Sequence, residues 1–212
     1  ESAEGGCPEL GWVTVPGGSF TMGSDAHASL GPSRQVTVPP FEVMRTEVTV
    51  AHYRRCVEAG ACSVPQCDAS DLFRFTPVCH YVTQQEARPV NFVTWAQART
   101  FAAWVGARLP SEAEWAFVAS DRGQQTRFPW GSQEASCDRA DTSLSGVSCG
   151  GDGMSDVCSL SAGLGSLGLC DLIGNVSELT ADPWHSSFQG APTDGSAWCS
   201  GASCEAEGLK VV

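Results

Sequence analysis

Cysteine is the residue type in this chain that is best able to do chemistry. The eleven cysteines lie at positions 7, 56, 62, 67, 79, 137, 149, 158, 170, 199 and 204. No two of them form a Cys-x-x-Cys pair and only four histidines accompany them, so the clustering that a zinc site needs is missing. Cysteines scattered over 212 residues favour a disulfide framework made in an oxidising compartment. We therefore expect a secreted, periplasmic or cell-surface protein.

The charge balance argues against nucleic acid and anionic lipid as partners. The chain carries 24 acidic residues against 12 basic ones, and Lys210 is its only lysine. A formal net charge of −12 repels phosphate groups and favours cation binding. No apolar run reaches the roughly 18 residues of a membrane-spanning helix. We expect neither nucleic-acid binding nor a membrane span.

Two helices in the middle of the chain are expected to organise the core that positions any site. Thr94 with Gln97, and Ser111 with Glu114, have the spacing of a capping box at a helix start. Gly106 suits the left-handed conformation that follows a helix end. The pattern predicts one helix from Thr94 to Gly106 and a second that begins after Ser111.

The N-terminal part alternates short strands with turns. Residues 12–15 and 19–22 predict two strands that a Pro-Gly-Gly turn joins into a hairpin. Residues 34–38 and 41–44 predict two more strands on either side of Pro39-Pro40, which cannot donate to a ladder.

Loops are expected to dominate the remaining sequence. A helix is predicted between the cap Thr49 and Gly60, followed by a cysteine-rich loop. Residues 137–170 are rich in Gly, Ser, Asp and Cys, which predicts little regular structure. Disulfides or bound cations would have to supply the order that packing cannot.

Six motifs occur together in the order and approximate spacing of one family. They are Pro16–Ser24, Glu47–Thr49, Arg88–Trp95, Arg108–Trp115, Phe128–Gly131 and Gly174–Glu178. On these motifs the chain resembles the formylglycine-generating enzyme family, also called the sulfatase-modifying factor domain. The resemblance implies one α+β domain over residues 1–212, related to C-type lectin domains and with little regular secondary structure. The cysteine count makes it a disulfide-rich member.

The resemblance leaves the activity open. The family's enzymes oxidise a sulfatase cysteine to formylglycine with oxygen and a copper ion held by two active-site cysteines. Other relatives have lost that chemistry, or use the fold for ligand display or iron-dependent sulfur transfer. The family's active-site cysteines follow a strand of the type Val-Val-Arg-Gly-Gly-Ser, whereas this sequence stops at Lys210-Val211-Val212. We expect that the catalytic segment is absent from this chain.

Two explanations for the absent segment stay open. After proteolytic cleavage, a C-terminal fragment or second chain could complete the fold and provide a partner for the odd cysteine. The alternative is a truncated paralogue. Cys199 and Cys204 have the spacing of the family's copper-binding pair but precede the expected strand, so we interpret them as a structural disulfide loop.

Calcium is the metal that the resemblance implies. The first family site corresponds to the side chains of Asp141 and Asp152 with the carbonyls of Thr142 and Met154. The second corresponds to the side chains of Asn175 and Glu178 with the carbonyls of Gly174 and Val176. Carboxylate, amide and carbonyl oxygens in a glycine-rich loop suit a hard cation. Solvated acidic turns and an Asx-type cap at Asn175 are the alternative.

Two hypotheses about function follow. In the first, the chain is a secreted, disulfide-rich, calcium-binding domain without oxidase activity, with a binding or structural role for a protein or small-molecule ligand. In the second, it belongs to a copper-dependent formylglycine-generating oxidase whose catalytic cysteines lie on a further segment. The family's Asn-x-Trp-Glu-Trp motif lacks both indoles here, at Ser177 and Leu179, which favours the first.

Overall fold

The computed structural model describes residues 10–26, 30–67, 79–124, 126–142, 149 and 154–199. Within these residues the elements are β1 (Trp12–Val15), β2 (Gly18–Met22), β3 (Arg34–Val38), β4 (Phe41–Met44), α1 (Val50–Glu58), α2 (Trp95–Trp104), α3 (Glu112–Ala119) and the short 3-10 helix η4 (Ser161–Gly163). Loops and turns make up the remainder of the described chain. The low content of regular structure that was predicted is confirmed.

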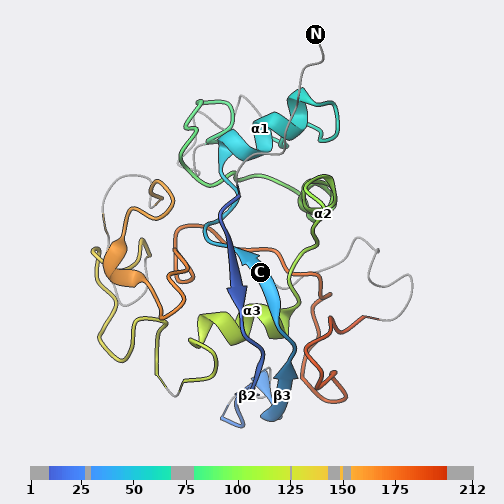
Figure 1. Cartoon of the computed structure of the whole chain (residues 1–212), viewed down its shortest axis with the longest axis vertical. Coiled ribbons are helices and arrows are strands. Elements are labelled where there is room, and N and C mark those ends of the chain that lie inside the picture. Colours follow the sequence, from blue (N-terminus) through green and yellow to red (C-terminus); the bar gives the residue numbers. More distant parts are fainter. Residues whose placement is uncertain are drawn as a thin grey trace.

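The four strands form one antiparallel ribbon that is broken in the middle (Figure 1). β1 pairs with β4, and β2 pairs with β3. The prediction that residues 12–15 and 19–22 pair with each other in a hairpin is therefore wrong. β1 runs on into β2, and β3 into β4, with the same register on both sides of the break. Val15 lies opposite Phe41, and Gly18 lies opposite Val38.

Prolines explain the break. Pro16-Gly17 on one arm faces Pro39-Pro40 on the other, and prolines have no amide hydrogen with which to continue the ladder. Gly17 is required at this point because a Cβ on it would lie 2.6 Å from the Val38 carbonyl oxygen. The Pro-Gly-Gly run was misleading because it is also typical of a reversing turn.

All three α-helices begin where the capping residues predicted. Thr49, Thr94 and Ser111 each accept a hydrogen bond from the backbone N–H three residues later, and the side chain of that residue reaches back to the cap amide. These reciprocal bonds satisfy donors that a helix start leaves unpaired. α1 and α2 end just before Gly60 and Gly106, which have φ values of +72° and +76°.

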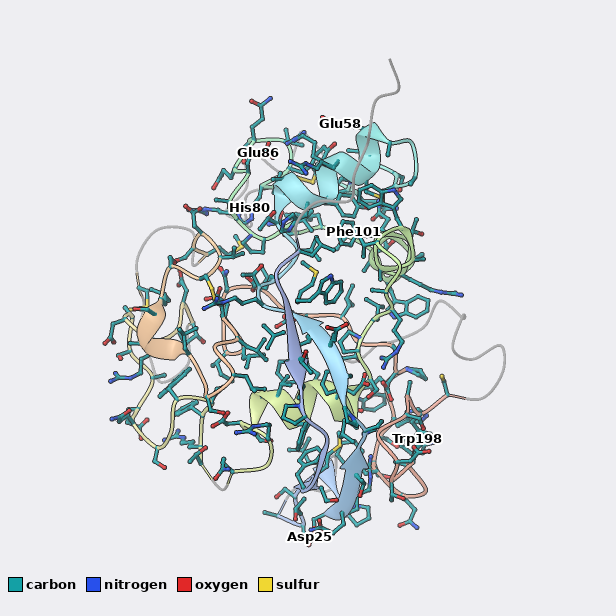
Figure 2. The ribbon with its side chains drawn as sticks, viewed as in Figure 1. Asp25, Glu58, His80, Glu86, Phe101 and Trp198 are labelled. Atoms are coloured by element: carbon teal, nitrogen blue, oxygen red, sulfur yellow. A yellow bond between two sulfur atoms is a disulfide. The ribbon has the colours of Figure 1, made fainter. Side chains whose placement is uncertain are left out.

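Two apolar clusters hold these elements together. The larger lies between α3 and the ribbon, where the Phe20 and Phe117 ring centroids are 5.3 Å apart. The second lies between α1 and α2, where Tyr53 stacks on Phe101 at 5.8 Å, with Phe101 on the inner side of α2 (Figure 2). α1 and α2 gather at one end of the ribbon, and β2 and β3 lie at the other (Figure 1). The ribbon therefore extends from the α1–α2 cluster to the cluster at α3.

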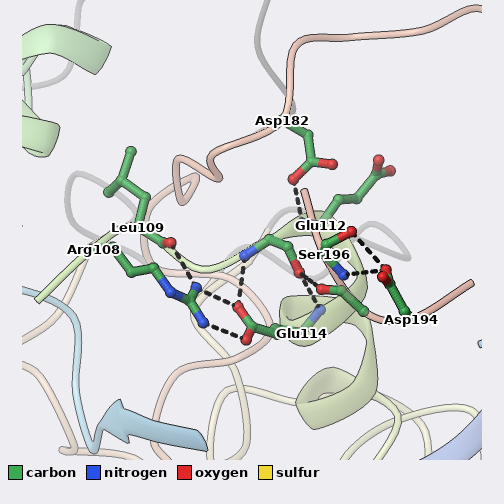
Figure 3. A network of polar contacts seen from close by, with 9 residues as sticks. Arg108, Leu109, Glu112, Glu114, Asp182, Asp194 and Ser196 are labelled. Atoms are coloured by element: carbon green, nitrogen blue, oxygen red, sulfur yellow. Dashed lines mark hydrogen bonds and ion pairs between the residues drawn. The ribbon is translucent and has the colours of Figure 1, made fainter. Parts of the chain in front are cut away.

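The start of α3 also anchors the last part of the described chain. Ser111 caps the helix, and its Oγ donates to the Gly195 carbonyl oxygen at 2.7 Å. The Asp182 carboxylate accepts the backbone N–H groups of Glu112 at 2.7 Å and of Trp198 at 2.6 Å. Figure 3 shows the Asp182–Glu112 bond within this network. Residues 182–198 are thereby fixed to the α3 N-terminus.

A Ser111→Ala variant is expected to lower the free energy of unfolding by about 2–3 kcal/mol, because it removes the helix cap and leaves the Gly195 carbonyl without its donor. Ser111 is 2% exposed, so water cannot replace the hydroxyl. Chemical denaturation measures the loss. Ser196→Ala is the matched control, since Ser196 is exposed and bonds only to its neighbour Asp194 in the described contacts. An equal effect of both changes would contradict the anchoring role.

The predicted disulfide framework is confirmed for the described residues. The pairs are Cys56–Cys62, Cys67–Cys79, Cys137–Cys149 and Cys158–Cys170. Cys199 is also disulfide-bonded, while Cys204, its predicted partner, lies outside the described residues. Disulfides of this number are typical of proteins made in an oxidising compartment. No helix in the described part of the chain has the length and apolar character to cross a membrane.

Candidate functional site

Asn175 joins three loops that are far apart in the sequence. Its side-chain N–H donates to Glu47 Oε2 at 2.8 Å, and its Oδ1 accepts the Ser155 backbone N–H at 2.9 Å. Its own backbone N–H donates to the Asp141 carbonyl oxygen at 2.7 Å. Asn175 has a φ of +58°, a left-handed conformation that Asn tolerates better than most residues. We call Glu47, Asp141, Ser155 and Asn175 the acidic junction.

Further contacts close the acidic junction tightly. Ser155 Oγ donates to Asp141 Oδ2 at 2.6 Å, and the Val176 N–H donates to Glu47 Oε1 at 3.3 Å. Gly174 passes so near that a Cβ on it would lie 2.3 Å from the Asp141 carbonyl oxygen, so only glycine fits without movement. Asp141 and Glu47 are both buried, each 8% exposed. The two loops that carry the predicted calcium ligands thus form one hydrogen-bonded unit.

Carboxyl groups crowd this unit and raise one another's pKa. Burial raises the pKa of Glu47 to about 9, and the charges of Glu178 and Asp171 add to the rise. Burial raises the pKa of Glu178 to about 7, with the Trp115 indole opposing the rise and Asp171 adding to it. Burial, with the charge of Asp141, also raises the pKa of Asp171. Without a cation nearby, Glu47 is therefore held protonated at neutral pH.

Glu47 and Glu178 both line a small cavity. Its volume is about 40 Å³, and Trp115 and Arg45 are among the residues that line it. Since a water molecule needs roughly 10–15 Å³ of such volume, the cavity has room for a water or an ion. Arg45 is the one cationic residue among the described residues that line it. A cation in this cavity would therefore reduce the electrostatic repulsion among the neighbouring carboxylates.

The structure brings together most of the predicted calcium ligands that it describes. Asp141 and Asn175 belong to the acidic junction, and Gly174 and Val176 flank Asn175. Glu178 lines the small cavity that Glu47 also lines. Thr142 lies beside Gly174, where its Cβ would be 3.3 Å from a Cβ built there. The sulfur of Met154 accepts a hydrogen bond from Asn91 Nδ2 at 3.9 Å. Asp152 lies outside the described residues.

The chemical types of the expected ligands suit calcium, although these ligands are not a cluster of acidic side chains alone. In the described part of the chain, no three His, Cys, Asp or Glu side chains form a group that could hold a metal ion. The implied ligands include an amide and backbone carbonyls, which calcium accepts as readily as carboxylates. The buried carboxyl groups of Glu47 and Asp141, and the small cavity that Glu47 and Glu178 line, are the observations that fit a cation.

Three participants were not predicted from the sequence. Glu47 was noted as part of the Glu47–Thr49 motif, but nothing local shows that it meets Asn175, which is 128 residues away. Asp171 precedes the Gly174–Glu178 motif, and its carboxylate accepts a hydrogen bond from the Cys158 N–H at 2.6 Å. Ser155 stands in a glycine- and serine-rich stretch in which no single serine is distinctive.

A groove runs beside the acidic junction and along β4. Its volume is about 560 Å³, within the range of small-molecule sites. The lining includes all four residues of β4, the inner side of α2, residues 105–110 and residues 176–179. Glu47 and Glu178 belong to both the groove and the small cavity. The groove is thus much larger than the small cavity and shares both of these acids with it.

The family is decided by a match along almost the whole sequence. The family model of the Sulfatase-modifying factor enzyme 1-like domain matches residues 3–210. The chain belongs to this family. The resemblance on the six motifs and the α+β fold that it implied are both confirmed.

Relatives of this sulfatase-modifying factor domain have differing named activities. Hercynine oxygenase from Mycolicibacterium smegmatis is 30% identical over 200 residues, which cover 81% of this chain and 45% of that protein. Formylglycine-generating enzyme from Thermomonospora curvata is 27% identical, covering 84% of this chain and 73% of its own. Inactive C-alpha-formylglycine-generating enzyme 2 from Bos taurus is 30% identical, covering 84% and 72%. This domain spans less than half of the hercynine oxygenase that it matches.

Solved structures confirm the fold. PvdO from Pseudomonas aeruginosa superposes with a TM-score of 0.68 at 28% identity, covering 89% of this chain and 77% of that one. Treponema denticola variable protein 1 superposes with a TM-score of 0.59 at 16% identity, covering 94% and 88%. At 16% identity, the similarity to the Treponema denticola protein supports the fold alone.

Proposed function

We propose that this sulfatase-modifying factor domain is a secreted or cell-surface, calcium-binding module without oxidase activity, which acts in binding or as a structural component. The observation that carries the proposal is the acidic junction, where buried carboxyl groups meet and the pKa of Glu47 is raised to about 9. A divalent cation would relieve this repulsion and fix three loops at once. The disulfides support export, because such bonds persist in oxidising compartments.

The proposed ligands are those that the family pattern assigns. The first set comprises the side chains of Asp141 and Asp152 with the carbonyls of Thr142 and Met154. The second set comprises the side chains of Asn175 and Glu178 with the carbonyls of Gly174 and Val176. Calcium supplies charge and coordination here, while Glu47 and Ser155 orient the two sets by hydrogen bonds. The role of the ion is to order loops that contain little regular structure.

The lack of oxidase activity is proposed on two grounds. All nine cysteines in the described part of the chain are disulfide-bonded, so none of them offers a free thiol for copper. A relative at 30% identity is named as an inactive formylglycine-generating enzyme. The second candidate function, a copper-dependent oxidase completed by cysteines elsewhere, is favoured by a relative named as a formylglycine-generating enzyme and by the size of the groove.

Calcium titration of the EDTA-treated chain tests the proposal. Calcium at one hundred times its dissociation constant should add about 2.7 kcal/mol and raise the melting temperature by roughly 5–10 °C. Asp141→Asn should weaken calcium binding at least tenfold, because it removes a carboxylate but keeps the shape. Asp138→Asn is the matched control, since Asp138 is an exposed acid three residues earlier. Absence of any shift at millimolar calcium would contradict the proposal.

A separate assay addresses the oxidase. The chain is incubated with copper(I), oxygen and a peptide that carries a sulfatase recognition cysteine. Loss of the substrate thiol together with formation of an aldehyde would overturn the non-catalytic role, whatever the calcium titration shows.

A further inference from the structure

Residues 182–198, which we call the strap, are held to the rest of the molecule by separate contacts. The strap contains no helix and no strand. Its Phe188 N–H donates to the Gly31 carbonyl oxygen at 2.7 Å, and its Thr193 carbonyl oxygen accepts the Thr37 N–H at 2.8 Å. The Phe188 ring belongs to the larger apolar cluster. A segment held in this way can open without unfolding of the whole domain.

One carboxylate attaches the strap to α3. Asp182 accepts the backbone N–H of Glu112, the first residue of α3, at 2.7 Å and that of Trp198 at 2.6 Å. Asp182 is 2% exposed. The His185 ring stacks on the Trp198 indole, with the ring centroids 3.7 Å apart. A change of charge beside Asp182 therefore acts on both ends of the strap.

The Glu112 side chain is a second acid at this place. No hydrogen bond reaches its carboxylate in the described contacts, and Figure 3 shows only the backbone bond to Asp182. Burial, and then the charge of Asp182, raises the pKa of Glu112 from 4.5 to about 7, with Arg34 and the positive end of the α3 dipole opposing the rise. Ionisation of Glu112 thus places a second negative charge beside a buried carboxylate.

Arg34 is the cation of this cluster, yet it pairs with neither acid in the described contacts. Its guanidinium lies over the Phe188 ring, 4.5 Å from the centroid, and its Nη2 donates to the Met22 sulfur at 3.7 Å. Its Nε and Nη1 are buried and have no hydrogen-bond partner in the described chain. Buried charged donors without an acceptor are costly, and a guanidinium suits a carboxylate. An ionised Glu112 would provide that acceptor.

We propose that the strap is a pH-sensitive latch, which is closed while Glu112 is protonated and released when Glu112 ionises. In the released form, Phe188 leaves the Arg34 guanidinium, and the ionised Glu112 carboxylate pairs with Arg34 in place of its position beside Asp182. The closed form binds the Glu112 proton more tightly than the released form, in which the pKa returns towards 4.5. Release is therefore increasingly favoured as pH rises from about 4.5 to about 7.

Three other titratable groups belong to the same elements. Glu114 on α3 is bonded to Arg108 by both carboxylate oxygens at 2.7 Å. Asp194 is exposed, and hydrogen bonds from Ser196 lower its pKa, so Asp194 stays ionised between pH 5 and pH 8. A histidine can change its charge near neutral pH, so His185 requires a variant of its own.

Amide hydrogen exchange of the complete chain, measured residue by residue by NMR at pH 5 and pH 8 in EDTA, tests the latch. Protection of the Trp198 N–H should fall at least tenfold more between these pH values than protection of the β2–β3 ladder, which reports unfolding of the whole domain. Glu112→Gln should abolish this additional fall, because glutamine stays neutral. His185→Phe should retain it, because the ring stack remains while the titrating group is removed.

Three results would overturn the latch. The first is a Trp198 amide whose protection changes with pH only as much as that of the β2–β3 ladder. The second is an additional fall that persists in Glu112→Gln. The third is an additional fall that is lost in His185→Phe, since the histidine would then be the sensor. The strap contains none of the proposed calcium ligands, so repeating the measurement in calcium should leave the additional fall unchanged and separates this test from that of calcium binding.

Discussion

An Asn175→Asp variant is expected to be much less stable than the natural chain in EDTA and to recover most of that loss in calcium. The Asn175 side-chain N–H lies 2.8 Å from Glu47 Oε2, so the change replaces a donor with a carboxylate oxygen beside a buried acid. The lost amide hydrogen bond and the placing of a charged carboxylate in this partly buried position should cost about 3–4 kcal/mol at pH 8. Asp tolerates the left-handed backbone at this position nearly as well as Asn, so strain contributes little. A calcium ion would turn the new carboxylate from an uncompensated charge into a ligand.

An Asn175→Gly variant provides the matched control for this prediction. Glycine adopts the φ of +58° freely but removes all three side-chain hydrogen bonds, one with Glu47 and two with Ser155. It should be destabilised in EDTA and in calcium alike, with a weaker calcium response. The measurement is thermal unfolding at pH 8 with and without calcium. Equal destabilisation of Asn175→Asp in both conditions would mean that no cation binds there.

A Glu47→Gln variant is expected to be more stable than the natural chain in EDTA at pH 8, yet similar to it at pH 5. The pKa of Glu47 is raised from its ordinary value of 4.5 to about 9, mainly by burial. Between these two values the folded chain binds the Glu47 proton more tightly than the unfolded chain does. The free energy of unfolding of the natural chain must therefore fall as pH rises through this window. Glutamine is neutral throughout, so the variant escapes the loss, which is on the order of 3–5 kcal/mol at pH 8.

Urea denaturation at intervals from pH 5 to pH 9 measures this difference. Glu42→Gln is the control, because Glu42 lies on the same part of the ribbon and lines the same groove but is exposed. Its stability should differ from that of the natural chain by less than about 0.5 kcal/mol at every pH. A Glu47→Gln difference that does not grow with pH would show that Glu47 is not held protonated by the fold.

The helices were predictable because their signals are local. Thr49, Thr94 and Ser111 define the helix starts by bonds to residues three positions away, and Gly60 and Gly106 mark two of the ends. A capping box needs no tertiary context, so a short stretch of sequence is enough to specify it. The strand segments were also found, since their alternation is local in the same sense.

The pairing of the strands could not be predicted from local sequence signals. Whether Trp12–Val15 pairs with the next strand or with β4 depends on contacts about thirty residues apart, which no propensity within either segment encodes. The acidic junction shows the same limit. The family pattern indicated Asp141 and Asn175, but Glu47 and Ser155 join them only through the folded arrangement of three loops.

The break in the ribbon has a consequence for how the fold could vary. One residue inserted on a single arm at Pro16-Gly17 or Pro39-Pro40 would offset one strand pair against the other and reverse which side chains of that pair face inward. Two residues inserted on both arms would keep both registers and both inward faces, and would lengthen the ribbon by about 7 Å. The α1–α2 end could then shift away from the α3 end while each apolar cluster kept its own contacts. The facing prolines thus mark the position at which this architecture tolerates a change of length.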